Sequence, residues 1–280
     1  MKKTKPSALT VFFTKFPRLL LAGIIFSSAL AVFMSIFAGI GYLTQFDNIL
    51  VWGLGLIPST LFLPGLVMVV RKYAVEKDFV PVIPTFFKAV KENLKAFVFH
   101  GIMIYLICAC SFFAILYYLT QAQTDAVFAY ILTLYIMFTA ILIVMLFYVP
   151  VMAVTYELRF RDIYKNSLLL VFGKILVNLL TFLFVGFFVC VGAALVIFTN
   201  GLMRVISIII VTALLPLLVT YISIAMISKG LQENVGVFVE ENIPKPSALS
   251  DEEMQAVKDS ISDDDYIFIN GKMIKNPNKH

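Results

Sequence analysis

Few residues in this chain have the types and the spacing that catalysis or metal binding requires. The three cysteines, Cys108, Cys110 and Cys190, all lie inside apolar runs, and none has a histidine partner at metal-site spacing. The sequence contains no phosphate-binding loop, zinc-protease motif, serine-hydrolase elbow or dinucleotide-binding fingerprint. The runs also lack the paired acids, or serine with histidine, that proteolysis within a membrane needs. We therefore predict a protein that is not an enzyme and has no catalytic residue, metal site or cofactor.

Asn178 is the most conspicuous polar residue inside an apolar run, with Thr181 three residues later. An intramembrane Asn commonly forms a hydrogen bond between helices. The same residue type can also line a polar path, and both interpretations stay open at this point. His100 lies in a run but near its end, which is typical of an interfacial side chain. Ionisable residues at membrane depth are the usual sign of a proton relay, so their scarcity disfavours proton-coupled transport.

A second group of candidates consists of prolines and glycines within a single run. Pro58 and Pro64 lie there together with Gly53, Gly55 and Gly65. Proline frees a backbone carbonyl, and helices broken in this way sometimes form binding sites in membrane proteins. More often such a break is a kink that neighbouring helices accommodate. Pro58 and Pro64 are therefore candidate functional residues, with packing as the alternative.

The elements that must position these residues are six long runs without a formal charge. Each run exceeds the roughly 20 apolar residues that cross a bilayer core of ~30 Å. At 61% apolar residues and a mean hydropathy of +0.95, the chain is too apolar for a soluble domain. Backbone groups in lipid must be satisfied internally, so we expect an all-α integral membrane protein. The six expected transmembrane helices lie near 19–42, 49–70, 97–119, 127–150, 175–198 and 205–228.

The basic residues predict how this bundle is oriented. Residues 1–18 hold five basic residues, 71–95 hold six and 157–174 hold four, whereas Arg204 stands alone on the other side. The positive-inside rule places the N-terminus and both long loops in the cytoplasm, and an even number of helices places the C-terminus there too. These basic residues adjoin the ends of the runs, where topology and lipid headgroups explain them. The pI of 9.0 therefore does not indicate nucleic-acid binding.

The chain divides into a six-span domain over 1–230 and an acidic cytoplasmic tail over 231–280. Within the tail, Asn270 and Gly271 stand between two short apolar stretches, a strong signal for a tight turn, and favour a hairpin over 266–275.

The two long loops also contain amphipathic segments. Over residues 85–97, five apolar residues fall within a helical arc of about 100°, and three lysines fall outside it. A shorter segment in the second loop places Phe160, Ile163, Tyr164 and Leu168 on one face. We expect interfacial helices here. Packing against the membrane helices and binding of a protein or lipid are both left open as their role.

The region 57–97 resembles the YesL family of bacterial membrane proteins. In that family a second span with a proline leads to a basic doublet and then to an amphipathic segment with a Phe-Lys and an Asn-Leu/Phe-Lys pattern. The matching residues here are Pro58, Arg71, Lys72, Phe87, Lys88, Lys91, Asn93 and Lys95. The resemblance implies a multi-pass protein of the bacterial plasma membrane, of unassigned biochemical function, that accompanies carbohydrate-uptake systems. The family offers no established catalytic or binding residues to transfer.

Two functions follow as hypotheses. The first is a non-catalytic accessory protein that assists or regulates a carbohydrate ABC importer, with the lipid bilayer and the importer subunits as partners and no nucleic acid. The alternative is a small-solute facilitator or channel that uses the broken second span and Asn178 as its polar path.

Overall fold

The computed structural model describes residues 7–156, 158–236, 266–269 and 272–275. Nearly all of the described residues are helical. The helices are α1 (Ala8–Thr44), α2 (Ile49–Gly53), α3 (Leu56–Ser59), α4 (Leu63–Arg71), α5 (Val82–Gln121), α6 (Ala126–Thr155), α7 (Phe160–Gly173), α8 (Ile175–Ile197) and α9 (Gly201–Leu231). A 3₁₀ turn, η1 (Thr60–Phe62), and two π-helical turns, η2 (Lys72–Glu76) and η3 (Gln232–Gly236), complete them.

Six helical segments are long and apolar enough to cross a membrane, which confirms the predicted fold class. They are Ala8–Thr44, Ile49–Glu76, Val82–Gln121, Ala126–Thr155, Ile175–Ile197 and Gly201–Val235. Several extend beyond the expected bounds. For example, α1 begins at Ala8 because the Ser7 side chain accepts a hydrogen bond from the Thr10 N–H and caps the helix.

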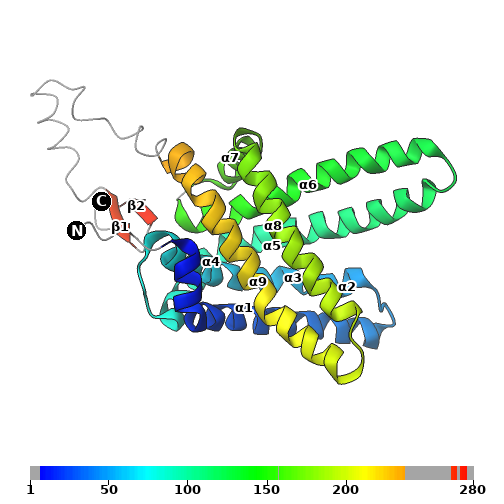
Figure 1. Ribbon diagram of the computed structural model, residues 1–280, viewed down its shortest axis with the longest axis horizontal. Helices are drawn as coiled ribbons and strands as arrows, with labels where there is room; N and C mark the ends of the chain where they lie inside the picture. The colour runs from blue at the N-terminus through cyan, green and yellow to red at the C-terminus, as the bar shows by residue number, and fades with distance from the viewer. Residues whose placement is uncertain (1–6, 157, 237–265, 270–271, 276–280) are drawn as a thin grey trace, which may run out of the picture.

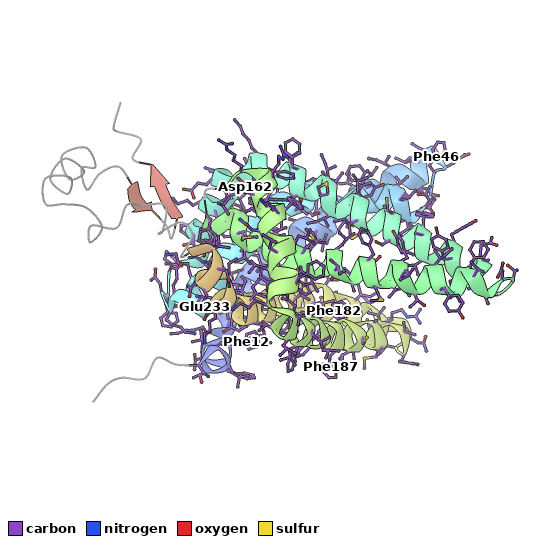
Figure 2. The ribbon with its side chains drawn as sticks, turned by 90° about the horizontal axis from the view of Figure 1, so that it is seen from above. Phe12, Phe46, Asp162, Phe182, Phe187 and Glu233 are labelled. Atoms are coloured by element: carbon purple, nitrogen blue, oxygen red, sulfur yellow. The ribbon has the colours of Figure 1, made fainter. Side chains whose placement is uncertain are left out.

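The helices pair as α1 with the second span, α5 with α6 and α8 with α9 (Figure 1). We call the end that carries residues 72–81, 158–159 and 232–236 the basic end, and the opposite end, with residues 45–48, 122–125 and 198–200, the distal end. Figure 2 shows Phe46 at the distal end, far from Phe12, Asp162 and Glu233. The α5–α6 and α8–α9 pairs diverge toward the distal end (Figure 1).

The second span is the most buried of the six. It consists of α2, α3, η1 and α4 in succession, because Pro58 and Pro64 cannot donate the backbone bonds of a regular helix. Side chains and tighter turns satisfy the carbonyls along this stretch. The Ser59 hydroxyl donates to the Gly55 carbonyl at 2.6 Å, and the Thr60 hydroxyl donates to the Ile57 carbonyl at 2.8 Å. These two hydroxyls therefore bond backbone carbonyls beside the prolines of the second span.

The hydrophobic core lies toward the basic end. Its largest fully buried side chains come from α1, the second span, α5, α6 and α9: Leu19, Leu66, Met68, Tyr73, Phe86, Phe97, Tyr148, Met152, Leu217, Ile224 and Ile227. The distal halves of α5, α6, α8 and α9 instead expose most of their apolar side chains. Such a surface is compatible with lipid rather than with water.

The two amphipathic segments differ from each other. Residues 85–97 are helical, but they form the first half of the continuous helix α5 rather than a separate interfacial helix. Helix α7 is a separate 14-residue helix. In the tail, β1 (Tyr266–Ile269) pairs antiparallel with β2 (Lys272–Lys275), with Ile269 opposite Lys272. The expected turn residues, Asn270 and Gly271, lie outside the described residues.

Candidate functional site

Most of the residues singled out from the sequence converge at the basic end. Arg71 and Lys72 end the second span, and both contact the carboxylate of Glu76, at 3.0 and 2.6 Å. Lys72 also lies 3.6 Å from Asp78. The Arg71 and Lys72 side chains are only 11% and 12% exposed, so their charges depend on these acids. The basic doublet is therefore an internally neutralised cluster.

The first turns of α5 pack against the second span through one face. Phe86, Asn93 and Phe97 are buried on this face, and the Asn93 amide donates to the Ala89 carbonyl at 2.7 Å. Phe87, Lys88, Lys91 and Lys95 are exposed on the other side. The expected apolar arc is thus divided, because the second span covers only part of it.

A hollow of about 300 Å³ lies where these two regions meet. It brings Lys72 and Lys88 together with Asp78, Glu92 and Thr85. Its lining carries two basic and two acidic side chains, so it has no strong preference for the charge of a ligand.

Pro58 and Pro64 lie apart from this end, inside the packed second span. A Cβ atom on Gly55 would lie 2.8 Å from the Met34 nitrogen and the Phe33 oxygen, and one on Gly65 would lie 2.6 Å from the Phe86 ring. These distances show that the backbone of the second span packs closely against the α1 backbone at Gly55 and against the Phe86 ring of α5 at Gly65. The geometry supports the packing interpretation of both prolines.

Asn178 holds the elbow between α7 and α8 together. Its amide nitrogen donates to the Leu170 and Val171 carbonyls, each at 2.9 Å, and its oxygen accepts from the Tyr148 hydroxyl at 2.6 Å. The helix is interrupted at Lys174, between α7 and α8. Asn178 bonds the Val171 carbonyl there and shares the Leu170 carbonyl with the Lys174 N–H. Its side chain thus joins α8 to α6 and α7, which supports a structural role over a polar path.

His100 forms a second tie between α5 and α7. This fully buried side chain lies 2.9 Å through Nδ1 from the Tyr164 hydroxyl and stacks on Phe160, with ring centroids 5.4 Å apart. Burial raises the pKa of Tyr164 to about 12, so its hydroxyl stays protonated at neutral pH. His100 is therefore part of a helix contact rather than an interfacial side chain.

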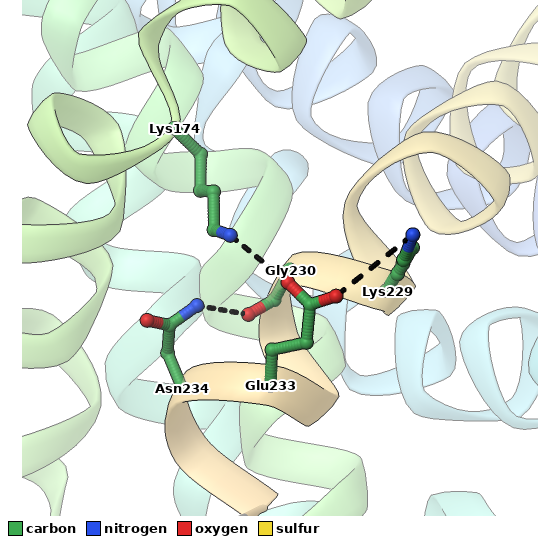
Figure 3. A network of polar contacts seen from close by, with 5 residues as sticks. All are labelled: Lys174, Lys229, Gly230, Glu233 and Asn234. Carbon is green, nitrogen blue, oxygen red and sulfur yellow. Dashed lines mark hydrogen bonds and ion pairs between the residues drawn. The ribbon is translucent and has the colours of Figure 1, made fainter.

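The turn η3, which follows α9, supplies a third tie to α7, through the elbow. Lys174 Nζ lies 3.0 Å from Glu233, which also lies 3.9 Å from Lys229 (Figure 3). The Asn234 amide donates to the Gly230 carbonyl at 2.6 Å (Figure 3). Lys174, Asn234, Lys165 and Asn166 line a hollow of about 420 Å³ at this elbow.

Three pairings in this region escaped prediction from the sequence: Glu76 with the basic doublet, His100 with Tyr164 and Lys174 with Glu233. The first joins neighbours in the chain, and its spacing of four and five residues was the available signal. The other two join residues 64 and 59 positions apart, and no local pattern predicts them. Within the described residues, no three His, Cys, Asp or Glu side chains are grouped as metal ligands.

Comparison with known proteins found no relative with which these features can be compared. No protein-family model, curated protein or solved structure matches the chain.

Proposed function

We propose that this protein is a non-catalytic accessory protein of the bacterial plasma membrane that binds a partner through α7. The partner proposed is a subunit of a carbohydrate ABC importer. That identity rests on the resemblance of residues 57–97 to the YesL family, which we propose as the family of this chain. Both termini are proposed to be cytoplasmic on the charge pattern alone.

The observation that carries the proposal is the way in which α7 is mounted. Three separate ties hold this short helix: Asn178 at its C-terminal end, Tyr164 with His100 and the Lys174–Glu233 ion pair at the elbow. Its buried face consists of Ile163, Ser167, Leu170 and Val171.

The opposite face of α7 is exposed in the described part of the chain. Leu169 and Phe172 are each 60% exposed, and Arg161 and Lys165 are exposed on the same side. A rigid helix that presents large apolar side chains beside positive charges supports docking of a partner helix or loop, because little order is lost on binding.

Affinity purification of the full chain from native membranes tests this proposal. The wild-type protein should bring an importer subunit with it in a fixed ratio. The double variant Arg161→Gln, Lys165→Gln should reduce that recovery severalfold, while Arg204→Gln at the distal end should leave it unchanged. Recovery of the protein alone, with normal sugar uptake in a deletion strain, would contradict the proposal.

The facilitator hypothesis receives no support from the candidate path residues. The Asn178 side chain forms three hydrogen bonds within the protein, and the second span is closely packed. Liposomes that contain the pure protein are expected to release a small trapped sugar no faster than empty ones.

A further inference from the structure

The first turns of α5 carry a row of lysines that the fold does not neutralise. Lys88, Lys91 and Lys95 lie within a helical arc of about 60° on the exposed side of the helix. In the described part of the chain, ion pairs form at Arg71, Lys72, Lys174 and Lys229, and none forms at these three lysines. Two sets of basic residues therefore exist at the basic end, one paired within the protein and one turned outward.

The length of α5 places this row at the membrane surface. Helix α5 has 40 residues, which corresponds to about 60 Å and is twice the bilayer core. Within α5, residues 96–121 form the one uncharged run long enough to cross the core, so this part must occupy it. Lys95 then stands at the edge of the hydrocarbon, and Lys88 lies about 10 Å further out along the axis. The headgroup layer occupies roughly this depth.

An exposed apolar stripe continues from the lysines toward the distal end. Leu94 and Val98 are 41% and 42% exposed, and Ile102, Phe113 and Leu116 are also exposed further along α5. An acyl chain can lie along this stripe only if its headgroup is beside the lysine row. A water-soluble acidic partner would gain nothing from the part of the stripe that lies within the bilayer.

The surface beside the lysines is also concave. A hollow of about 410 Å³ is lined by Pro84, Phe87, Lys88, Lys91 and Glu92. Its two ammonium groups outnumber the single carboxylate, so a phosphate group gains net attraction there. Phe87 provides an apolar wall beside the two ammonium groups.

We propose that Lys88, Lys91 and Lys95 form a binding site for the phosphate headgroups of anionic phospholipids. The site holds lipid against the face of α5 that is opposite to its contacts with the second span. Lipid selected in this way fixes the depth of α5 in the membrane and thereby the position of the packed basic end.

Native mass spectrometry of the full-length protein in detergent tests the site directly. Protein is mixed with equal amounts of phosphatidylglycerol and phosphatidylcholine, and the ratio of the two lipids retained is measured. The wild type should favour phosphatidylglycerol. Replacing all three lysines by Gln should lower the ratio at least about tenfold, since a basic residue near an anionic surface contributes about fivefold. The matched variant with three Lys→Arg changes should keep the wild-type ratio.

Several results would overturn the proposal. The first is a wild-type lipid ratio near one, and the second is a ratio that the three Lys→Gln changes leave unaltered. The third is an equal fall of the ratio in the Lys→Arg variant, which would show that charge is not the cause. A wild type that ignores lipid charge but binds a polyglutamate peptide through these lysines would assign the row to an acidic protein. Unfolding temperatures of the variants within a few degrees of the wild type establish that the fold is retained.

Discussion

At the scale of single residues, polar side chains in this protein hold helices to one another. Asn178 illustrates this, since its side chain, carried by α8, bonds both α6 and α7. The Thr60 hydroxyl likewise reaches the Phe97 carbonyl of α5 at 3.3 Å. Hydrogen bonds of this kind are worth about 1 kcal/mol each in membrane proteins. Asn178 thereby fixes α7, and Thr60 fixes the second span against α5.

Replacing Asn178 by Leu should therefore destabilise the protein. Three hydrogen bonds are lost, and the Leu170 carbonyl keeps only the Lys174 N–H, so we expect a cost on the order of 2 kcal/mol. Thermal unfolding in detergent measures it. Tyr148→Phe, which removes one of the three bonds, should cost roughly half as much. Unchanged stability in Asn178→Leu, with altered solute flux in liposomes, would favour the polar path instead.

The two ion-pair clusters should differ in their importance for stability. Glu76→Gln removes the carboxylate that contacts both Arg71 and Lys72, which are nearly buried, and should cost about 2 kcal/mol or more. Glu233 is 49% exposed, so solvent screens its pairs and Glu233→Gln should cost clearly less than Glu76→Gln. Unfolding of both variants at low salt provides the comparison. Equal effects would show that burial does not decide the strength of these pairs.

At the scale of elements, the close contacts of the second span give its glycines a testable role. Gly55→Ala would bring a Cβ to 2.8 Å from the α1 backbone. The backbone cannot move aside cheaply, so we expect a loss of about 2 kcal/mol. Gly39→Ala is the matched control, because a Cβ there meets no other atom within 4 Å. It should be neutral or slightly stabilising, as expected for alanine in a helix. Equal unfolding temperatures for the two variants would contradict this packing.

The sequence predicts the number and the kind of these elements well, and their connections less well. Six apolar runs become six membrane-crossing segments because the hydrophobic effect and backbone bonding both act locally. By contrast, the lysines Lys88, Lys91 and Lys95 suggest a separate surface helix. In the structure this segment belongs to the continuous helix α5 and packs against the second span. His100 with Tyr164 and Lys174 with Glu233 depend on the tertiary fold and leave no local trace.

At the scale of the whole molecule, the core lies at one end and the distal halves of the helices diverge. Orientation in the membrane remains the prediction of the charge pattern. It can be tested in a background without Cys108, Cys110 and Cys190. A membrane-impermeant maleimide should label Gln123→Cys in intact cells, and Asp162→Cys only after permeabilisation. Labelling in the reverse order would invert the proposed topology.

Crosslinking in native membranes, followed by mass spectrometry, tests the proposed accessory function most directly. An amine-reactive reagent should join Lys165 on the outward face of α7 to a second membrane protein, and that protein should be an importer subunit. The linkage should weaken in a Phe172→Ala variant that keeps the lysine. Crosslinks confined to this chain, in membranes where the importer is abundant, would contradict the proposal that α7 is a docking helix.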